Sequence, residues 1–118
     1  MRERVALIGA GPSGMALLRS LALAEDAGAA VPEVVAFERQ DDWGGQWNLD
    51  WRTGADRHGE PVHSAMYRDL WINGPKECME YPDYPFDAHF GRAVSSYLPR
   101  EAMRDYICLL YTSDAADE

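Results

Sequence analysis

The feature that most constrains this chain is a glycine turn that lies between an apolar run and an amphipathic segment. The run Arg4–Ile8 is apolar and stops at a glycine, a pattern typical of a buried parallel strand. Residues 9–14 then read Gly-Ala-Gly-Pro-Ser-Gly, which has the spacing G-x-G-x-x-G. From Ser13 to about Ala27 the apolar residues fall at helical spacing, with Arg19 on the expected solvent side. The N-terminus therefore predicts strand, turn and helix in that order.

A second apolar run, Val34–Phe37, ends in the acidic residue Glu38. Strand, glycine turn, helix, strand and acidic residue is the order of a dinucleotide-binding βαβ unit. In such a unit Gly9 allows the tight turn, Gly11 lets the backbone approach a pyrophosphate, and Gly14 lets helix and strand pack closely. The pyrophosphate would bind the N–H groups at the helix start, and Glu38 would accept hydrogen bonds from ribose hydroxyls. The alternative is a glycine turn without a ligand.

The segment after Glu38 bears on which dinucleotide binds. A carboxylate at this position repels a 2′-phosphate, so the site should hold FAD or NAD and not NADP. An NAD dehydrogenase would continue with another helix and strand, but residues 39–64 show neither helical nor strand periodicity. Within them, residues 43–47 read Trp-Gly-Gly-Gln-Trp, where paired glycines allow close backbone approach and indoles offer flat surfaces to a planar cofactor. FAD is favoured, while a surface loop anchored by tryptophan is the alternative for this segment.

The rest of the chain predicts irregular structure and one more helix. The tryptophans at 43, 47 and 51 indicate a packed loop, and residues 67–86 are aromatic, rich in proline and expected to be extended. Lys76 and Glu77 are interpreted as a structural or solvated pair, and Cys78 as a small apolar filler. A last helix is expected from Pro99, with an apolar stripe that includes Met103 and Tyr106. The predicted fold class is α/β: a partial, truncated Rossmann-like FAD-binding domain with a parallel sheet.

Composition excludes several classes of partner. The chain has 118 residues, enough for about one domain, and 20 acidic against 11 basic residues give a net charge of −9. That balance disfavours nucleic acids and anionic membranes. The apolar stretches are far shorter than the roughly 20 residues of a membrane span. Two cysteines without metal-ligand spacing predict neither a disulfide framework nor a metal site, so a cytoplasmic location is expected.

Several segments together resemble one family. Residues 9–14, 38–48, 51–54, 66–77 and 81–86 are similar to the N-terminal part of the flavin-containing monooxygenases, and among these to the bacterial trimethylamine monooxygenases most. The resemblance extends in register from residue 1 to about 107. It implies an enzyme that uses FAD and NADPH to form a flavin hydroperoxide. That species oxygenates an amine to an N-oxide, or a sulfide. A homodimer is one expected state of the whole protein.

The resemblance also implies roles for individual residues. It places the FAD pyrophosphate at Gly9, Gly11, Ser13 and Gly14, and the ribose at Glu38. Further FAD contacts are implied for Gln40, Gln46, Trp47 and His63. Trp71 would lie near the nicotinamide end of NADP, and Asn73 beside the reactive face of the flavin as the catalytic residue.

Asn73 suits that role chemically. An amide has two donors and one acceptor and does not titrate, so it can hold a peroxide and a carboxamide without releasing hydrogen peroxide by protonation. The alternative is local: Asn73-Gly74-Pro75 is also a strong turn signal. From the residues alone the two interpretations are equally favoured, and the resemblance supports the functional one.

Parts of the family pattern are absent, and the end of the chain departs from it. The second glycine turn, which binds NADPH, and the remaining strands of the FAD sheet do not occur in these 118 residues. Residues 108–118 resemble a translated sequencing-library adapter, so we expect residues 1–107 to be the N-terminal part of an FAD-binding domain and 108–118 a non-native tail. The rival interpretations are an NAD-dependent dehydrogenase and an inactive nucleotide-binding fragment.

Overall fold

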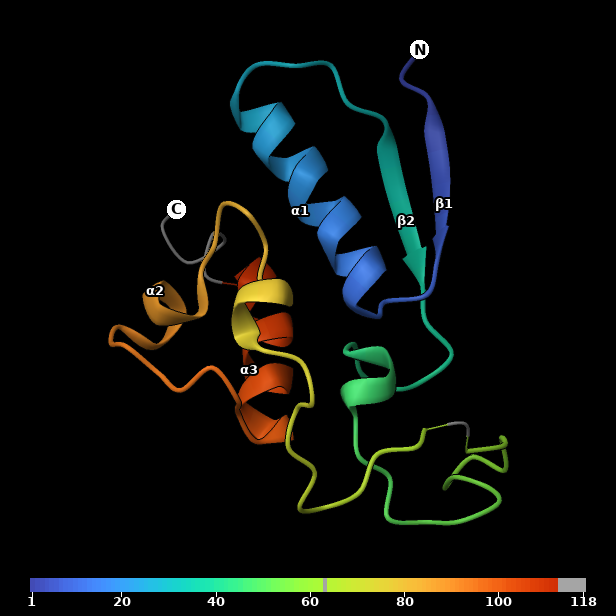
Figure 1. The fold of residues 1–118 in the computed structure, drawn as a ribbon. Helices are drawn as coiled ribbons and strands as arrows, with labels where there is room; N and C mark the ends of the chain where they lie inside the picture. The colour runs from blue at the N-terminus through green and yellow to red at the C-terminus, as the bar shows by residue number, and fades with distance from the viewer. Residues whose placement is uncertain (63, 113–118) are drawn as a thin grey trace. The chain divides into compact units, whose positions relative to one another are not determined.

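The computed structural model describes residues 1–62 and 64–112, with the backbone alone from 109 to 112. The described elements are β1 (Arg4–Ile8), α1 (Pro12–Asp26), β2 (Glu33–Phe37), α2 (Phe86–Phe90) and α3 (Arg100–Thr112), with short 3₁₀ helices η1 (Gly45–Trp47) and η2 (Lys76–Cys78) (Figure 1). They form two compact units. The first unit comprises residues 1–45 and the chain from Ile107 onward, and the second comprises residues 46–106. None of the described helices is long and apolar enough to span a membrane.

The first unit contains the predicted βαβ arrangement. β1 and β2 pair in parallel, with Arg4 opposite Glu33 and Ile8 opposite Phe37. Parallel strands need a crossover connection, and α1 provides it, running alongside the two strands (Figure 1). The predicted strands and first helix are confirmed, with end points that differ by no more than a residue. The α/β class and the truncated Rossmann-like fold are therefore correct.

Burial in the first unit departs from the sequence prediction in two places. Both strands were expected to be buried, yet Ile8 is 80% exposed and Phe37 55% exposed. A buried parallel strand needs neighbours and cover on both faces, whereas the described residues supply two strands. Arg19 was expected on the solvent side of α1 but is buried, as is Met15 on the same helix. A long aliphatic stem lets an arginine pack in this way.

An aromatic cluster forms the core of the second unit. The rings of Phe86, at the start of α2, and Tyr106, on α3, stack with centroids 3.9 Å apart, and both side chains are fully buried. The Tyr106 hydroxyl accepts a hydrogen bond from the Tyr81 N–H at 2.8 Å and donates one to the Tyr84 carbonyl at 2.5 Å. Burial raises the pKa of Tyr106 to about 12. This phenol therefore fastens the proline-rich segment to the helix.

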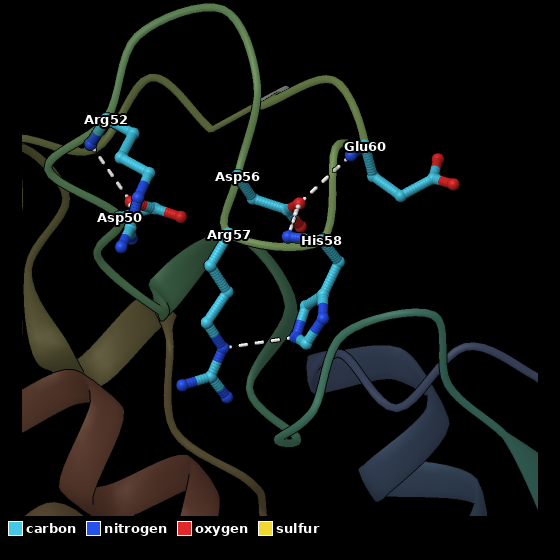
Figure 2. Close-up of polar contacts among 6 residues, drawn as sticks. All are labelled: Asp50, Arg52, Asp56, Arg57, His58 and Glu60. Carbon is cyan, nitrogen blue, oxygen red and sulfur yellow. Dashed lines mark hydrogen bonds and ion pairs between the residues drawn. The ribbon is translucent and has the colours of Figure 1, made fainter.

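The long loop of the second unit is folded by its own polar side chains (Figure 2). One carboxylate oxygen of Asp56 accepts hydrogen bonds from the N–H groups of His58 at 2.8 Å and Glu60 at 3.0 Å. Asp50 likewise accepts from the Arg52 N–H at 2.9 Å. These are side-chain turns of the kind that aspartate favours. They explain how a segment without periodicity acquires a defined backbone.

Two further expectations in this unit were wrong. Trp51 was expected to be packed, but it is 79% exposed and carries the Arg52 guanidinium 4.6 Å from its ring centroid. Cys78 was expected to be an apolar filler, but it is exposed. Trp51 lies in an irregular segment and Cys78 ends the single-turn 3₁₀ helix η2, so neither segment has a period long enough to indicate which face is buried.

The last helix, α3, was expected from Pro99 and begins one residue later, at Arg100. Cys108 is buried, and its thiol lies 3.7 Å from the Trp43 carbonyl oxygen, to which it donates. The helix continues to Thr112, past the boundary expected at residue 107. Residues 113–118 of the expected tail lie outside the described residues.

Candidate cofactor site

The glycine turn of the first unit has the tight geometry that its spacing predicted. Gly9 has a positive φ of 98°, and its N–H donates to the Phe37 carbonyl at 2.8 Å, which joins the end of β1 to the end of β2. Gly14 packs so closely on this turn that a Cβ placed there would be 2.3 Å from the Gly9 carbonyl oxygen. Position 14 therefore requires glycine because helix α1 starts against the turn.

The start of α1 is suited to an anion. Gly11 is the N-cap and supplies no side-chain cap, Pro12 has no N–H, and the first turn has no acidic residue. The N–H groups of Gly11, Ser13 and Gly14 thus have no partner within the helix, and they lie at its positive dipole end. Free donors and a positive dipole in a cradle of glycine are what a pyrophosphate requires. The residues present fit that group.

Glu38 is tied to the same turn. Its carboxylate accepts the Ala10 N–H at 2.6 Å through one oxygen and the Gln40 N–H at 2.8 Å through the other. Burial by itself raises the pKa of Glu38, but backbone N–H donors from Gln40, Ala10 and Arg39, with the Arg39 charge, outweigh it, so the pKa is lowered. The carboxylate is therefore ionised at neutral pH. Three backbone donors leave at least one carboxylate lone pair for a ribose hydroxyl.

The paired glycines after Glu38 also serve the turn. Gly44 donates from its N–H to the Ala10 carbonyl at 2.8 Å, and a Cβ on Gly45 would lie 2.9 Å from the Gly11 Cα. Both glycines have positive φ, 116° and 58°. The sequence suggested that these glycines allow close backbone approach to a cofactor. In the structure the close approach is to the glycine turn itself, at Ala10 and Gly11.

The remaining predicted site residues belong to the second unit or lie outside the described residues. Gln46 and Trp47 form part of η1, Gln46 exposed and Trp47 half-buried, while Trp71 and Asn73 are exposed. The structure thus brings together the residues predicted for the pyrophosphate and ribose, with Gln40 beside them. Gln46, Trp47, Trp71 and Asn73 lie in the second unit. His63 lies outside the described residues.

Comparison with known proteins identifies the family. A model of the flavin-binding monooxygenase-like family matches residues 2–115. The chain belongs to this family.

Individual relatives agree with the family match. The chain is 62% identical over 104 residues to a trimethylamine monooxygenase of Methylocella silvestris, covering 88% of the chain and 23% of that protein. A crystal structure of Tmm from Pelagibacter sp. superposes with a TM-score of 0.85 at 49% identity, covering 98% of the chain and 26% of the relative. An S-allyl-L-cysteine S-oxygenase of Allium sativum gives a TM-score of 0.68 at 28% identity, over 91% and 24%. The chain therefore spans about a quarter of the length of these flavin monooxygenases. The expected boundary between a native segment 1–107 and a non-native tail stays a prediction.

Sequence reasoning missed two features of the site region. The first is the contact of Glu38 with the glycine turn, where its carboxylate accepts the Ala10 N–H; no periodicity signals a side chain that caps a backbone N–H. The second is the partner of Lys76, which was expected to form a structural or solvated pair with Glu77: its side chain is only 7% exposed and pairs with Asp87. Its partner Asp87 lies 11 residues further along the chain, beyond any local pattern.

Proposed function

We propose that this chain is the FAD-binding N-terminal part of an NADPH-using, cytoplasmic monooxygenase that oxygenates amines or sulfides through a flavin hydroperoxide. The observation that carries the proposal is the glycine cradle at the start of α1, held by Glu38 and by Gly44. The named activities of the relatives, one on trimethylamine and one on a sulfur compound, support the substrate classes.

In this proposal the first unit binds and orients the cofactor. The N–H groups of Gly11, Ser13 and Gly14 bind the pyrophosphate, and Glu38 binds the ribose hydroxyls. FAD, when bound, supplies the redox and oxygen chemistry. Gln40, Gln46, Trp47 and His63 remain proposed FAD contacts on the strength of the resemblance.

The second unit is proposed to supply the catalytic amide. The Asn73 side chain is exposed and makes no hydrogen bond to another described residue, so its donors and acceptor are available. An amide at a reacting oxygen can donate a hydrogen bond without transferring a proton. We propose that Asn73 acts in this way and that Trp71 flanks the nicotinamide.

The test of cofactor choice is direct binding to the chain. FAD and NAD are titrated separately into the purified protein, with flavin fluorescence and calorimetry as readouts. FAD should bind at least about tenfold more tightly than NAD, a difference of about 1.4 kcal/mol. Binding of NAD without FAD, or of neither, would overturn the proposal.

A matched pair of glycine variants tests whether the cradle is the site. Gly45→Ala places a methyl group 2.9 Å from the Gly11 Cα at a φ of 58°, whereas Gly28→Ala has a similar φ of 84° with no atom within 4 Å. Both carry backbone strain, but only Gly45→Ala deforms the phosphate turn. We expect FAD affinity to fall at least about tenfold in Gly45→Ala, about 1.4 kcal/mol, and to be retained in folded Gly28→Ala. Equal affinities would place the flavin elsewhere.

A further inference from the structure

Lys76 has a buried ammonium group in the second unit. Its side chain is 7% exposed, and its Nζ donates to a carboxylate oxygen of Asp87 and to the Val94 carbonyl at 2.8 Å. A lysine is almost never this buried unless its charge is paired, because desolvation of an ammonium is costly. The pairing also affects Asp87, since the hydrogen bond from Lys76 and one from the Val94 N–H lower the pKa of that carboxyl.

This ammonium joins segments that are distant in the sequence. Asp87 lies on α2, and its oxygen that binds Lys76 also accepts the Val94 N–H at 3.0 Å. The Lys76 backbone N–H donates to the Ser96 carbonyl at 2.7 Å. Side chain and backbone of one residue therefore fix the start of η2 against α2 and the segment that follows it.

Asn73 lies between two such attachments. On one side the Ile72 N–H donates to the Leu98 carbonyl at 2.9 Å, and the Ile72 side chain is 4% exposed. On the other side is Lys76. The Asn73 amide itself makes no hydrogen bond to another described residue. The backbone that these two attachments hold therefore sets the direction in which the Asn73 side chain leaves the chain.

We infer that Lys76, paired with Asp87, is a positioning residue that fixes the Asn73 amide for the oxygenation reaction. The inference rests on the proposed catalytic role of Asn73. Lys76 acts through the backbone of residues 73–76 and has no assigned contact with cofactor or substrate. An apolar residue of similar length would fill its space without holding Asp87 and Val94.

The variants follow from these contacts. Lys76→Met shortens the unbranched side chain by one heavy atom and removes its donors. Asp87 then remains half-exposed and still accepts the Val94 N–H, so no unpaired charge is left buried. Asp87→Asn is a milder version that keeps an acceptor oxygen. Glu77→Gln is the matched control, because Glu77 is the exposed neighbour whose carboxylate accepts the Ser96 hydroxyl at 2.9 Å.

The first readout is the backbone order of Asn73 in the 118-residue chain, measured by ¹⁵N relaxation. We expect an order parameter of about 0.8 in the parent chain and in Glu77→Gln, falling below about 0.6 in Lys76→Met and by less in Asp87→Asn. The order of residues around Tyr106 should be unchanged in all variants, which shows that the core is intact. An unchanged order parameter at Asn73 in Lys76→Met overturns the inference.

The second readout is the coupling of NADPH oxidation to oxygenation. Residues 1–107 replace the matching segment of the Methylocella trimethylamine monooxygenase, and hydrogen peroxide and oxygenated trimethylamine are measured against NADPH consumed. Lys76→Met and Asn73→Ser should each raise the peroxide fraction several-fold at equal FAD content, and the double variant should match Asn73→Ser alone. Full coupling in Asn73→Ser refutes the role of Asn73 itself. Uncoupling in Asn73→Ser without uncoupling in Lys76→Met refutes only the positioning role.

Discussion

Replacing Gly14 by alanine tests the packing at the centre of the phosphate turn. Gly14 lies in the first turn of α1, where its φ is helical and alanine is normally the better residue, by about 1 kcal/mol. The added Cβ would, however, lie 2.3 Å from the Gly9 carbonyl oxygen. Relief requires a backbone movement of about 1 Å, because non-bonded heavy atoms prefer separations well above 3 Å.

The size of the effect follows from how firmly Gly9 is held. Its N–H is bonded to the Phe37 carbonyl at 2.8 Å, and its φ of 98° is a conformation that glycine alone adopts readily. Overpacking typically lowers the free energy of unfolding by about 1–3 kcal/mol, and for a clash with fixed backbone we expect a value at the upper end, about 3 kcal/mol. After subtraction of the helix-propensity gain of about 1 kcal/mol, Gly14→Ala should lower the free energy of unfolding by about 2 kcal/mol.

The assay is urea unfolding of the 118-residue chain, followed by circular dichroism. Ser20→Ala is the matched control on the same helix, since Ser20 is exposed and its hydroxyl donates to the Ala16 carbonyl at 2.9 Å. That change removes a side-chain bond that competes with helix geometry and should add up to about 0.5 kcal/mol. If Gly14→Ala were as stable as the parent chain, the close packing of helix on turn would be refuted.

Two further predictions concern pH. Because the pKa of Glu38 is lowered in the fold from 4.5, its ionised form stabilises the chain above that pH, and this contribution is lost as the pH falls through the lower folded value. Unfolding of Glu38→Gln and parent chain from neutral pH downward should therefore show a difference that shrinks in acid; a constant difference contradicts the contacts at Ala10. Tyr106→Phe removes the hydroxyl that accepts the part-buried Tyr81 N–H and should cost about 1–3 kcal/mol. Since folding raises the Tyr106 pKa from 10 to about 12, the parent should lose stability between these values while Tyr106→Phe does not, as measured by alkaline unfolding.

The sequence by itself determined the βαβ unit and the family. β1, α1 and β2 were predictable because strand and helix periods are local properties of the sequence. The glycines at 9, 11 and 14 indicated the turn between β1 and α1, because glycine at such spacing is mainly required by tight turns and close packing. The acidic residue at the end of β2 was likewise set by its distance from the turn. These elements also carry the proposed FAD cradle.

The tertiary structure alone decided how the irregular segments are held. That Gly45 packs on Gly11, that Glu38 caps the Ala10 N–H, and that Lys76 is buried against Asp87 are contacts between residues 11 to 34 positions apart. Such contacts depend on where the backbone has been placed by other elements, so no local period encodes them. The same reason explains the wrong expectations for Arg19, Trp51 and the exposed strands. Residue type sets a preference for burial, but the neighbours that a chain folds against decide whether that burial is achieved.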